Sequence, residues 1–204
     1  MADTGSFKIE EEMNSRRKFL VAATSVAGGI AGVAVATPFM LSMMPSERAK
    51  AAGAPVEVDI SRLEEGLLLM VEWRGRVVWI LKRTPEMLET LVTLEGELAD
   101  PKSEKDQQPD YAANQTRSIK PEILVVVGLC THLGCSPVYR KDIAPEDLGA
   151  DWLGGFFCPC HGSKFDLAGR VYKNLPAPTN LVVPPHTYLS DNLLLIGAES
   201  KESA

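Results

Sequence analysis

The stretch "FCPCHGSKFD", from Phe157 to Asp166, brings two cysteines and a histidine close together in a chain that has only 4 Cys and 3 His. A second stretch, "CTHLGC", runs from Cys130 to Cys135 and contains the other two cysteines together with His132. Thiolates and imidazoles are ligands that iron and zinc prefer, and two loops that carry them can close around one site. The two clusters therefore predict a metal centre built from two loops.

The composition is that of a globular protein. The 204 residues are 45% hydrophobic and 24% charged, and the formal net charge is -6 at pH 7. The charges up to Ser46 cancel, so the negative charge belongs to the part of the chain that follows. An acidic domain repels phosphate groups, and we therefore expect no nucleic acid among its partners.

An uncharged, mostly apolar run extends from Phe19 to Ser46. It is longer than the roughly 20 residues that a helix needs to cross a bilayer, and it predicts a transmembrane anchor helix over residues 19–46. A cleavable signal peptide is the alternative, but the apolar part of such a peptide usually has only about 7 to 15 residues.

The segment before this run, "SRRKFL" at residues 15–20, resembles a bacterial twin-arginine export signal. The basic residues also place residues 1–18 in the cytoplasm by the positive-inside rule. We therefore expect a single-pass protein of the bacterial inner membrane with its soluble domain in the periplasm. The twin-arginine route carries folded proteins, which suggests that a cofactor is inserted before export.

The chain after the anchor is divided into a tether and a β domain. Residues 47–55 are rich in Ala without a hydrophobic stripe, which predicts a flexible tether. Residues 56–204 contain short apolar and β-branched runs that predict antiparallel strands. These runs lie at 56–60, 67–73, 76–84, 122–129, 154–158, 170–174, 180–184 and 192–197.

Local patterns add detail to this domain. Arg74 and Gly75 separate two strand-like runs as in a hairpin, and residues 85–94 begin with Pro and predict a helix. Residues 99–118 are too polar to supply core and predict a surface loop. We expect His186 to be a surface strand residue, because no other ligand type lies near it, and we expect the tryptophans beside the hairpin turn, Trp73 and Trp79, to be core.

The spacing of the ligands within the two clusters distinguishes between a zinc site and an iron-sulfur site. The patterns C-x-H-x-x-C and C-x-C-H offer more ligands than four-coordinate zinc needs, and neither cysteine pair has the C-x-x-C spacing of a zinc ribbon. A framework of disulfides alone would leave His132 and His161 without a role. The pattern matches the Rieske signature, in which two histidines replace two cysteines on one iron of a 2Fe-2S cluster.

The chain as a whole resembles the iron-sulfur subunits of the cytochrome bc complex, ubiquinol:cytochrome c oxidoreductase, in their proteobacterial form. The resemblance rests on "CTHLGCSP" and "CPCHGSKFD", and more weakly on "EWRGRVVWILKRTPEML" and the "PAP" at residues 176–178. It implies an all-β antiparallel Rieske-type domain with cluster-binding loops, preceded by one N-terminal transmembrane helix. The cluster-binding part would occupy about residues 122–180.

The resemblance implies one 2Fe-2S cluster and assigns its ligands. Cys130 and Cys158 bind one iron as thiolates, while His132 and His161 bind the other through one ring nitrogen each. Neutral imidazoles leave less negative charge on the cluster than thiolates do, which favours the reduced form. The outward nitrogen of His161 is then the catalytic group that accepts a proton from the substrate.

Further roles follow from the same resemblance. Cys135 and Cys160 pair as a disulfide that joins the two loops, which suits an oxidising compartment. Leu133 shields the cluster from water, although it could instead be ordinary core, and Ser163 donates a hydrogen bond to a cluster sulfur. Many family members have Tyr where this chain has Phe165, so we expect one hydrogen bond to the cluster to be missing.

The function that the resemblance implies is electron transfer within an enzyme complex. The subunit takes an electron and a proton from ubiquinol and passes the electron to a c-type cytochrome as its head moves on the tether, which contributes to proton translocation. The implied partners are a cytochrome b subunit and a c-type cytochrome subunit in a membrane-embedded complex, which we expect to be dimeric and without which the subunit is inactive.

Two other functions remain open from the residues. One is a binding module stabilised by structural zinc, which would be colourless. The other is a subunit of an arsenite-oxidase type enzyme, which shares the Rieske motifs and twin-arginine export but is disfavoured by the "WRG" hairpin and the long anchor.

Overall fold

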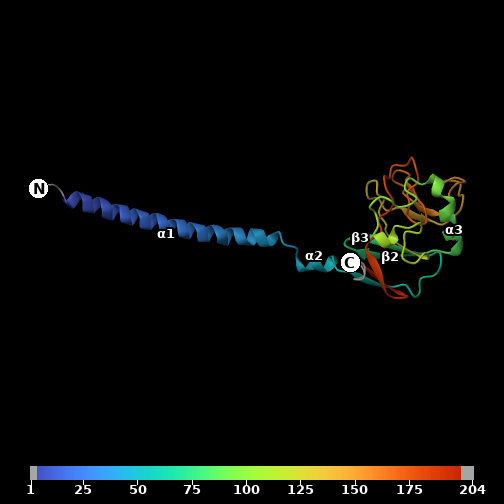
Figure 1. Ribbon diagram of the computed structural model, residues 1–204, viewed down its shortest axis with the longest axis horizontal. Helices are drawn as coiled ribbons and strands as arrows, with labels where there is room; N and C mark the ends of the chain where they lie inside the picture. The colour runs from blue at the N-terminus through green and yellow to red at the C-terminus, as the bar shows by residue number, and fades with distance from the viewer. Residues whose placement is uncertain (1–3, 199–204) are drawn as a thin grey trace. The chain divides into compact units, whose positions relative to one another are not determined.

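The computed structural model describes residues 4–198. The chain divides into two compact units, one ending at Lys50 and the other beginning at Ala51. This division falls within the predicted tether. Figure 1 labels the principal elements of both units.

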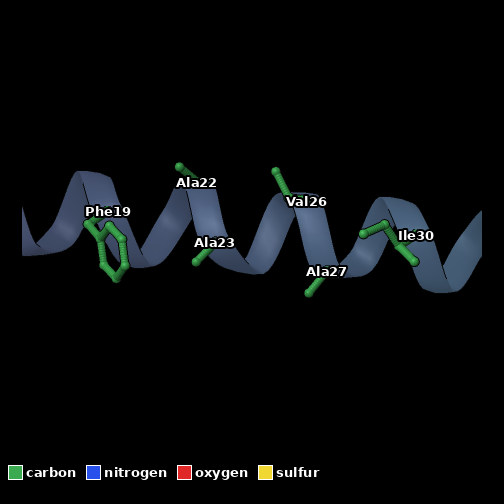
Figure 2. A pocket seen from close by; sticks show the side chains of 6 residues that line it. All are labelled: Phe19, Ala22, Ala23, Val26, Ala27 and Ile30. Atoms are coloured by element: carbon green, nitrogen blue, oxygen red, sulfur yellow. The ribbon is translucent and has the colours of Figure 1, made fainter.

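The first unit consists mainly of helix α1, Thr4–Ser42, of which the part Asn14–Ser42 is long and apolar enough to cross a membrane. Its apolar side chains are exposed, and Figure 2 shows six of them projecting from the helix surface between Phe19 and Ile30. The predicted anchor differs at both ends, because α1 extends into the charged N-terminal segment and ends four residues before Ser46. Helix α1 ends before Ser46 for a physical reason, because Pro45 disfavours helical geometry at the preceding residue, Met44.

Helix α2, Glu47–Ala52, occupies most of the predicted tether, so the segment is helical where the sequence suggested no regular structure. Alanine has the highest helix propensity, and the N–H of Ala49 donates to the hydroxyl of Ser46 at 3.2 Å as a helix cap. Lys50 also pairs with Glu47 at 2.7 Å. The flexibility of this segment stays a prediction.

Up to residue 198, the β domain contains three antiparallel sheets of three strands each, with the orders β1-β9-β8, β2-β3-β4 and β5-β6-β7. The predicted antiparallel β architecture is therefore confirmed. The strands are β1 Val56–Asp59, β2 Leu68–Trp73, β3 Arg76–Lys82, β4 Ile123–Val127, β5 Val138–Arg140, β6 Gly155–Phe157, β7 Lys164–Phe165, β8 His186–Ser190 and β9 Leu193–Ile196.

The predicted hairpin and the predicted helix are both confirmed (Figure 1). Strands β2 and β3 pair through a two-residue turn in which Arg74 and Gly75 have φ of 52° and 69°, as a type I′ turn requires. Helix α3, Pro85–Thr93, follows directly, and the hydroxyl of Thr84 accepts a hydrogen bond from the N–H of Met87 at 3.3 Å. Two short 3-10 helices, Glu95–Glu97 and Asp110–Ala112, lie in the connection to β4.

The sheet β2-β3-β4, which we call the central sheet, separates two hydrophobic cores. Along β4, Leu124 and Val126 pack into a core that also contains Cys130 and Cys158, which we call the cysteine core. Ile123 and Val125 pack on the opposite side, in a core that contains Trp73. Alternation along a strand places successive side chains on opposite faces, which explains why all of β4 is apolar and buried. Both tryptophans beside the hairpin turn are buried, as predicted.

Two predicted strands are wrong, and two short strands, β5 and β7, were not predicted. The run at 170–174 forms only isolated antiparallel bridges, from Val171 to Phe165 and from Tyr172 to Leu98, and the run at 180–184 forms no strand. The N–H of Val171 donates to the side chain of Asn180 at 2.9 Å instead of to a neighbouring strand. Strands β5 and β7 were missed because they have only three and two residues and are partly polar.

Two surface predictions also require correction. The loop at 99–118 is irregular, but it does not lie wholly on the surface, because three of its residues, Ala112, Arg117 and Ser118, are buried. His186 does lie in a strand, but it is only 1% exposed. Its backbone N–H donates to the hydroxyl of Tyr111 at 2.7 Å, and its Nδ1 lies 2.8 Å from the carbonyl of Pro184. Such partners make the burial of polar groups tolerable.

Candidate metal centre

The first cysteine cluster follows β4 and folds as a loop closed by its own backbone. The N–H of Cys130 donates to the carbonyl of Cys135 at 2.7 Å, and the N–H of Gly134 donates to the carbonyl of Cys130 at 2.9 Å. Gly134 has φ of 80°, in the left-handed region that glycine adopts without strain. The loop therefore depends on glycine at this position.

The second cluster, between β6 and β7, repeats this hydrogen-bond pattern. The N–H of Cys158 donates to the carbonyl of Ser163 at 2.8 Å, and the N–H of Gly162 donates to the carbonyl of Cys158 at 2.9 Å. Gly162 has φ of 78°, close to the value of its counterpart in the first loop. Cys130 and Cys158 thus occupy equivalent positions at the starts of two equivalent loops.

The predicted iron ligands come together in two pairs. Cys130 and Cys158 are both buried with free thiols, and the Cys130 thiol is near enough to raise the pKa of the Cys158 thiol. The rings of His132 and His161 pack edge to face, with their centroids 4.7 Å apart. The loops thus gather two sulfur and two nitrogen ligands, the donor set of a Rieske cluster.

The disulfide between Cys135 and Cys160 is present, as predicted, and it joins the tips of the two loops. The sulfur atoms of Cys135, Cys158 and Cys160 lie within 4.8 Å of one another. These three atoms do not form a thiolate site, because two of them are consumed by the disulfide. The disulfide therefore leaves Cys130 and Cys158 as the thiols that can bind metal.

The local electrostatics suit a cation between the loops. Burial raises the pKa of the Cys158 thiol, and so does the neighbouring Cys130 thiol, whereas hydrogen bonds from the backbone N–H groups of Cys160 and His161 act to lower it. A bound metal ion replaces such thiol protons and stabilises the thiolates. The Nδ1 atom of His132 is buried and has no hydrogen-bond partner in the described part of the chain, which fits a nitrogen that a metal ion would bind.

Ser163 connects the second loop to a third loop, the "PAP" segment at 176–178. Ser163 is fully buried, and its hydroxyl oxygen accepts a hydrogen bond from the N–H of Ala177 at 3.0 Å. The hydroxyl hydrogen is left to be donated elsewhere. This geometry is compatible with the predicted hydrogen bond from Ser163 to a cluster sulfur.

Thr131 was not among the predicted site residues, although it stands between two of them. Its hydroxyl donates to the carbonyl of Thr179 at 2.7 Å and so ties the first loop to the third. The sequence signal was its position inside the ligand cluster, but its partner lies far along the chain and only the fold identifies it.

The remaining predicted residues lie as follows. Leu133 is 70% exposed, which excludes the reading as ordinary core and leaves its side chain at the surface beside His132. His161 is exposed as well. Phe165 is fully buried in the cysteine core and pairs with Phe156 across β6 and β7.

Comparisons with known proteins agree with this donor set. Residues 101–185 match a family model described as "Rieske [2Fe-2S] domain". Residues 8–46 match one described as "Ubiquitinol-cytochrome C reductase Fe-S subunit TAT signal". The two models together cover the export segment and the three loops.

Several whole proteins are similar over most of the chain. The "Ubiquinol-cytochrome c reductase iron-sulfur subunit" of Allochromatium vinosum is 62% identical, with 90% of this chain and 89% of the relative aligned. The protein of the same name from Blastochloris viridis is 43% identical, over 90% of this chain and 93% of the relative. Among solved structures, a chain of "Hyperthermophilic respiratory Complex III" aligns with 87% of this chain and 98% of its own length, at 25% identity and a TM-score of 0.47.

Proposed function

The chain belongs to the family of ubiquinol-cytochrome c reductase iron-sulfur subunits, and we propose that it carries electrons from a quinol to a c-type cytochrome within that complex. The observation that carries this proposal is the 62% identity with the Allochromatium vinosum subunit over 90% of the chain. The chain is a Rieske electron-transfer subunit of an oxidoreductase complex and holds one 2Fe-2S cluster.

We assign the cluster to the paired side chains of the two loops. Cys130 and Cys158 would bind one iron, because they are buried thiols at equivalent loop positions. His132 and His161 would bind the other iron, since their rings lie side by side. When bound, the cluster supplies a one-electron acceptor whose potential is raised by its two neutral imidazole ligands.

The residues around the cluster have separate tasks. The exposed His161 would accept a proton from the quinol hydroxyl at its outward ring nitrogen, which keeps proton and electron acceptors adjacent. The hydroxyl of Ser163 would donate a hydrogen bond to a sulfur atom and so stabilise negative charge there. The exposed side chain of Leu133 would exclude water from the cluster on the quinol side.

Membership of the family defines the partners and the location in less detail than it defines the cofactor. The chain is a subunit of the cytochrome bc1 complex, with a membrane-anchored and exported soluble domain. We propose that α1 spans the bacterial inner membrane, that the β domain lies in the periplasm, and that cytochrome b and a c-type cytochrome are its direct partners in a dimeric complex. The export signal and the apolar helix support the topology.

Electron paramagnetic resonance of dithionite-reduced membranes tests this function. We expect a Rieske spectrum whose shape changes when an inhibitor of the quinone site is added, since such an inhibitor contacts the cluster histidine. A colourless purified protein with one zinc ion would instead select the zinc-stabilised module. A Rieske spectrum that no quinone-site inhibitor alters would contradict quinol oxidation at this cluster.

A further inference from the structure

Asn180 is a fully buried polar residue that lies two residues after the third loop. It is 0% exposed, although asparagine is mostly exposed in proteins. Its Oδ1 accepts a hydrogen bond from the N–H of Val171 at 2.9 Å, and its Nδ2 donates to the carbonyl of Asp100 at 3.0 Å. A buried amide with such partners calls for a physical reason.

The two partners of Asn180 require an amide. The N–H of Val171 needs an acceptor, and the carbonyl of Asp100 needs a donor. Asparagine offers both from one side chain, whereas an ionised aspartate offers only acceptors and leucine offers neither. A longer contact from Nδ2 to the hydroxyl of Ser103, at 3.4 Å, agrees with the same orientation of the amide.

The hydrogen bond to Val171 closes the base of the segment that carries the third loop. Val171 and Asn180 are nine residues apart, and the third loop lies between them. Pro176 and Pro178 fix their own φ angles and restrict the residues before them, which makes this part of the segment stiff. A shift at Asn180 is therefore passed on to Ala177.

Both ends of this segment are attached to the second cluster loop. Val171 forms an antiparallel bridge with Phe165, one of the two residues of β7, and β7 begins directly after Ser163. The N–H of Ala177 in turn donates to the hydroxyl oxygen of Ser163. These contacts form a closed ring from Ser163 through β7, Val171 and Asn180 to Ala177 and back.

This ring of contacts shares a core with the cysteine ligands. Phe165, Val171 and Ala177 belong to the cysteine core, together with Cys130 and Cys158. Phe165 and Val171 are 0% exposed, and Ala177 is 4% exposed. Side chains in such a core are closely packed, so the ring cannot shift without displacing its neighbours.

A second contact links Asn180 to the first cluster loop. The N–H of Asn180 and the carbonyl of Thr179 belong to one planar peptide group. That carbonyl accepts the hydrogen bond from the hydroxyl of Thr131, which lies between Cys130 and His132 in the sequence. Direct contacts therefore connect the surroundings of Asn180 to both cluster loops.

The consequence for the cluster concerns the hydroxyl of Ser163. Because its oxygen accepts the N–H of Ala177, its hydrogen remains for donation to another group. Donation is strengthened when the oxygen accepts at the same time, since linked hydrogen bonds polarise one another. If Ala177 moved away, the hydroxyl would be free to rotate and its hydrogen bond to a cluster sulfur would weaken.

We propose that Asn180 is a positioning residue of the metal centre, which holds Ala177 so that the hydroxyl of Ser163 donates to a cluster sulfur. This inference rests on the proposed function, because it requires the cluster to be present and Ser163 to contact it. A hydrogen bond to the sulfur stabilises the negative charge that reduction adds to the cluster. Loss of the Asn180 amide should therefore lower the reduction potential.

The test measures the midpoint potential and the paramagnetic resonance spectrum of full-chain variants in assembled membranes. Asn180→Leu keeps a side chain of similar volume but removes both hydrogen bonds. A whole hydrogen bond shifts an equilibrium by about two- to tenfold, and here one is only weakened, so we expect the reduction equilibrium to fall about two- to fivefold. This change corresponds to about 20 to 40 mV, because tenfold is about 59 mV for a one-electron couple.

Two further variants separate this effect from general destabilisation. Ser118→Ala also removes a buried hydrogen-bonding group, but its partners, Arg83 and Thr116, lie outside the three loops. It should lower the free energy of unfolding and leave the potential unchanged. Asn180→Ser leaves room for a water molecule beside the freed backbone groups. It should lower the potential as Asn180→Leu does, and it provides the comparison if Asn180→Leu loses the cluster.

A double-mutant cycle shows whether Asn180 acts through Ser163. Ser163→Ala removes the hydrogen bond itself, so most of the decrease caused by Asn180→Leu should disappear in that background. The inference is wrong if the decrease is equally large with and without the Ser163 hydroxyl, or if Ser163→Ala leaves the potential unchanged. It is also wrong if both Asn180 variants keep the parent potential, or if both lose the cluster, because Asn180 would then serve only folding. Absence of any Rieske spectrum in the parent protein would contradict the proposed function itself.

Discussion

At the scale of single residues, the metal centre depends on the chemistry of a few side chains and on what surrounds them. Phe165 illustrates this, because it is fully buried in the same core as Cys130 and Cys158. A phenylalanine there packs as well as a tyrosine but offers no hydroxyl to a cluster sulfur. The identity of this residue should therefore affect the potential more than the fold.

We predict that Phe165→Tyr raises the reduction potential. A hydrogen bond to a charged acceptor contributes about 1.5 to 3 kcal/mol, but only the difference between the two redox states shifts the potential, so the change should be smaller. Redox titration of the variant beside the parent protein at one pH measures it. An unchanged or lower potential, with a structure showing the phenol within hydrogen-bond distance of Cys158 or Cys130, would contradict the prediction.

The ligand assignment predicts an all-or-none result. His132→Ala should abolish the 2Fe-2S cluster, because it removes one of the four protein ligands, and iron content with the paramagnetic resonance spectrum is the readout. The control is His186→Gln, since His186 lies in β8 outside both ligand loops and its replacement should leave the cluster in place. A normal Rieske spectrum in His132→Ala would refute the assignment.

At the scale of elements, helix α2 is the segment whose behaviour matters most. It has six residues and belongs to a stretch in which the chain passes from one compact unit to the other. Isolated helices shorter than about 12 residues are marginal in water. A helix this short can therefore unwind at little cost, which is compatible with a tether that changes its length.

Stiffening this segment should slow turnover without harming the cluster. Replacing residues 49–54 by prolines fixes an extended backbone, and we expect slower quinol oxidation with an unchanged Rieske spectrum. A Gly-Ala sequence of the same length is the control and should preserve the rate. If the proline variant oxidised quinol at the parent rate, a moving tether would not be required in this protein.

At the scale of the whole molecule, two hydrophobic cores on opposite faces of the central sheet stabilise the fold. Polar groups buried between the sheets and the loop at 99–118 also contribute. His186 is one such group: it joins β8 to Tyr111 in the loop before β4. Burial lowers the pKa of His186 from its ordinary value of 6.5, partly offset by the hydrogen bond to the carbonyl of Pro184. The folded protein thus keeps this imidazole neutral where the unfolded chain protonates it.

This difference predicts a loss of stability on acidification. Below about pH 6.5, His186 binds a proton in the unfolded chain but not in the folded protein. The free energy of unfolding therefore decreases as the pH falls below about 6.5, and this decrease ends once the pH is below the lowered pKa of folded His186. The slope contributed is at most about 1.4 kcal/mol per pH unit. His186→Phe should remove this slope in denaturant unfolding of the full chain in detergent. The prediction fails if parent and variant lose stability equally between neutral and acidic pH.

The sequence by itself determined the parts of this protein that depend on neighbours along the chain. The cysteine and histidine spacings, the hairpin turn at Arg74 and Gly75, the proline that begins α3 and the apolar anchor are all local patterns, and each specifies its structure through few residues. The antiparallel β class followed from the same kind of signal. Where a local signal was weak, as in the short strand β7, the prediction failed.

Only the tertiary structure decided which distant groups meet. The polar loop at 99–118 appeared superficial, yet Arg117 is buried because the carbonyls of Ala168 and Gly169 accept its hydrogen bonds. His186 is buried for a similar reason. A polar side chain can be buried only where hydrogen-bond partners are available in the interior, and those partners come from segments far apart in sequence. Burial of polar groups is thus a property of the assembled fold, whereas ligand spacing is a property of the chain.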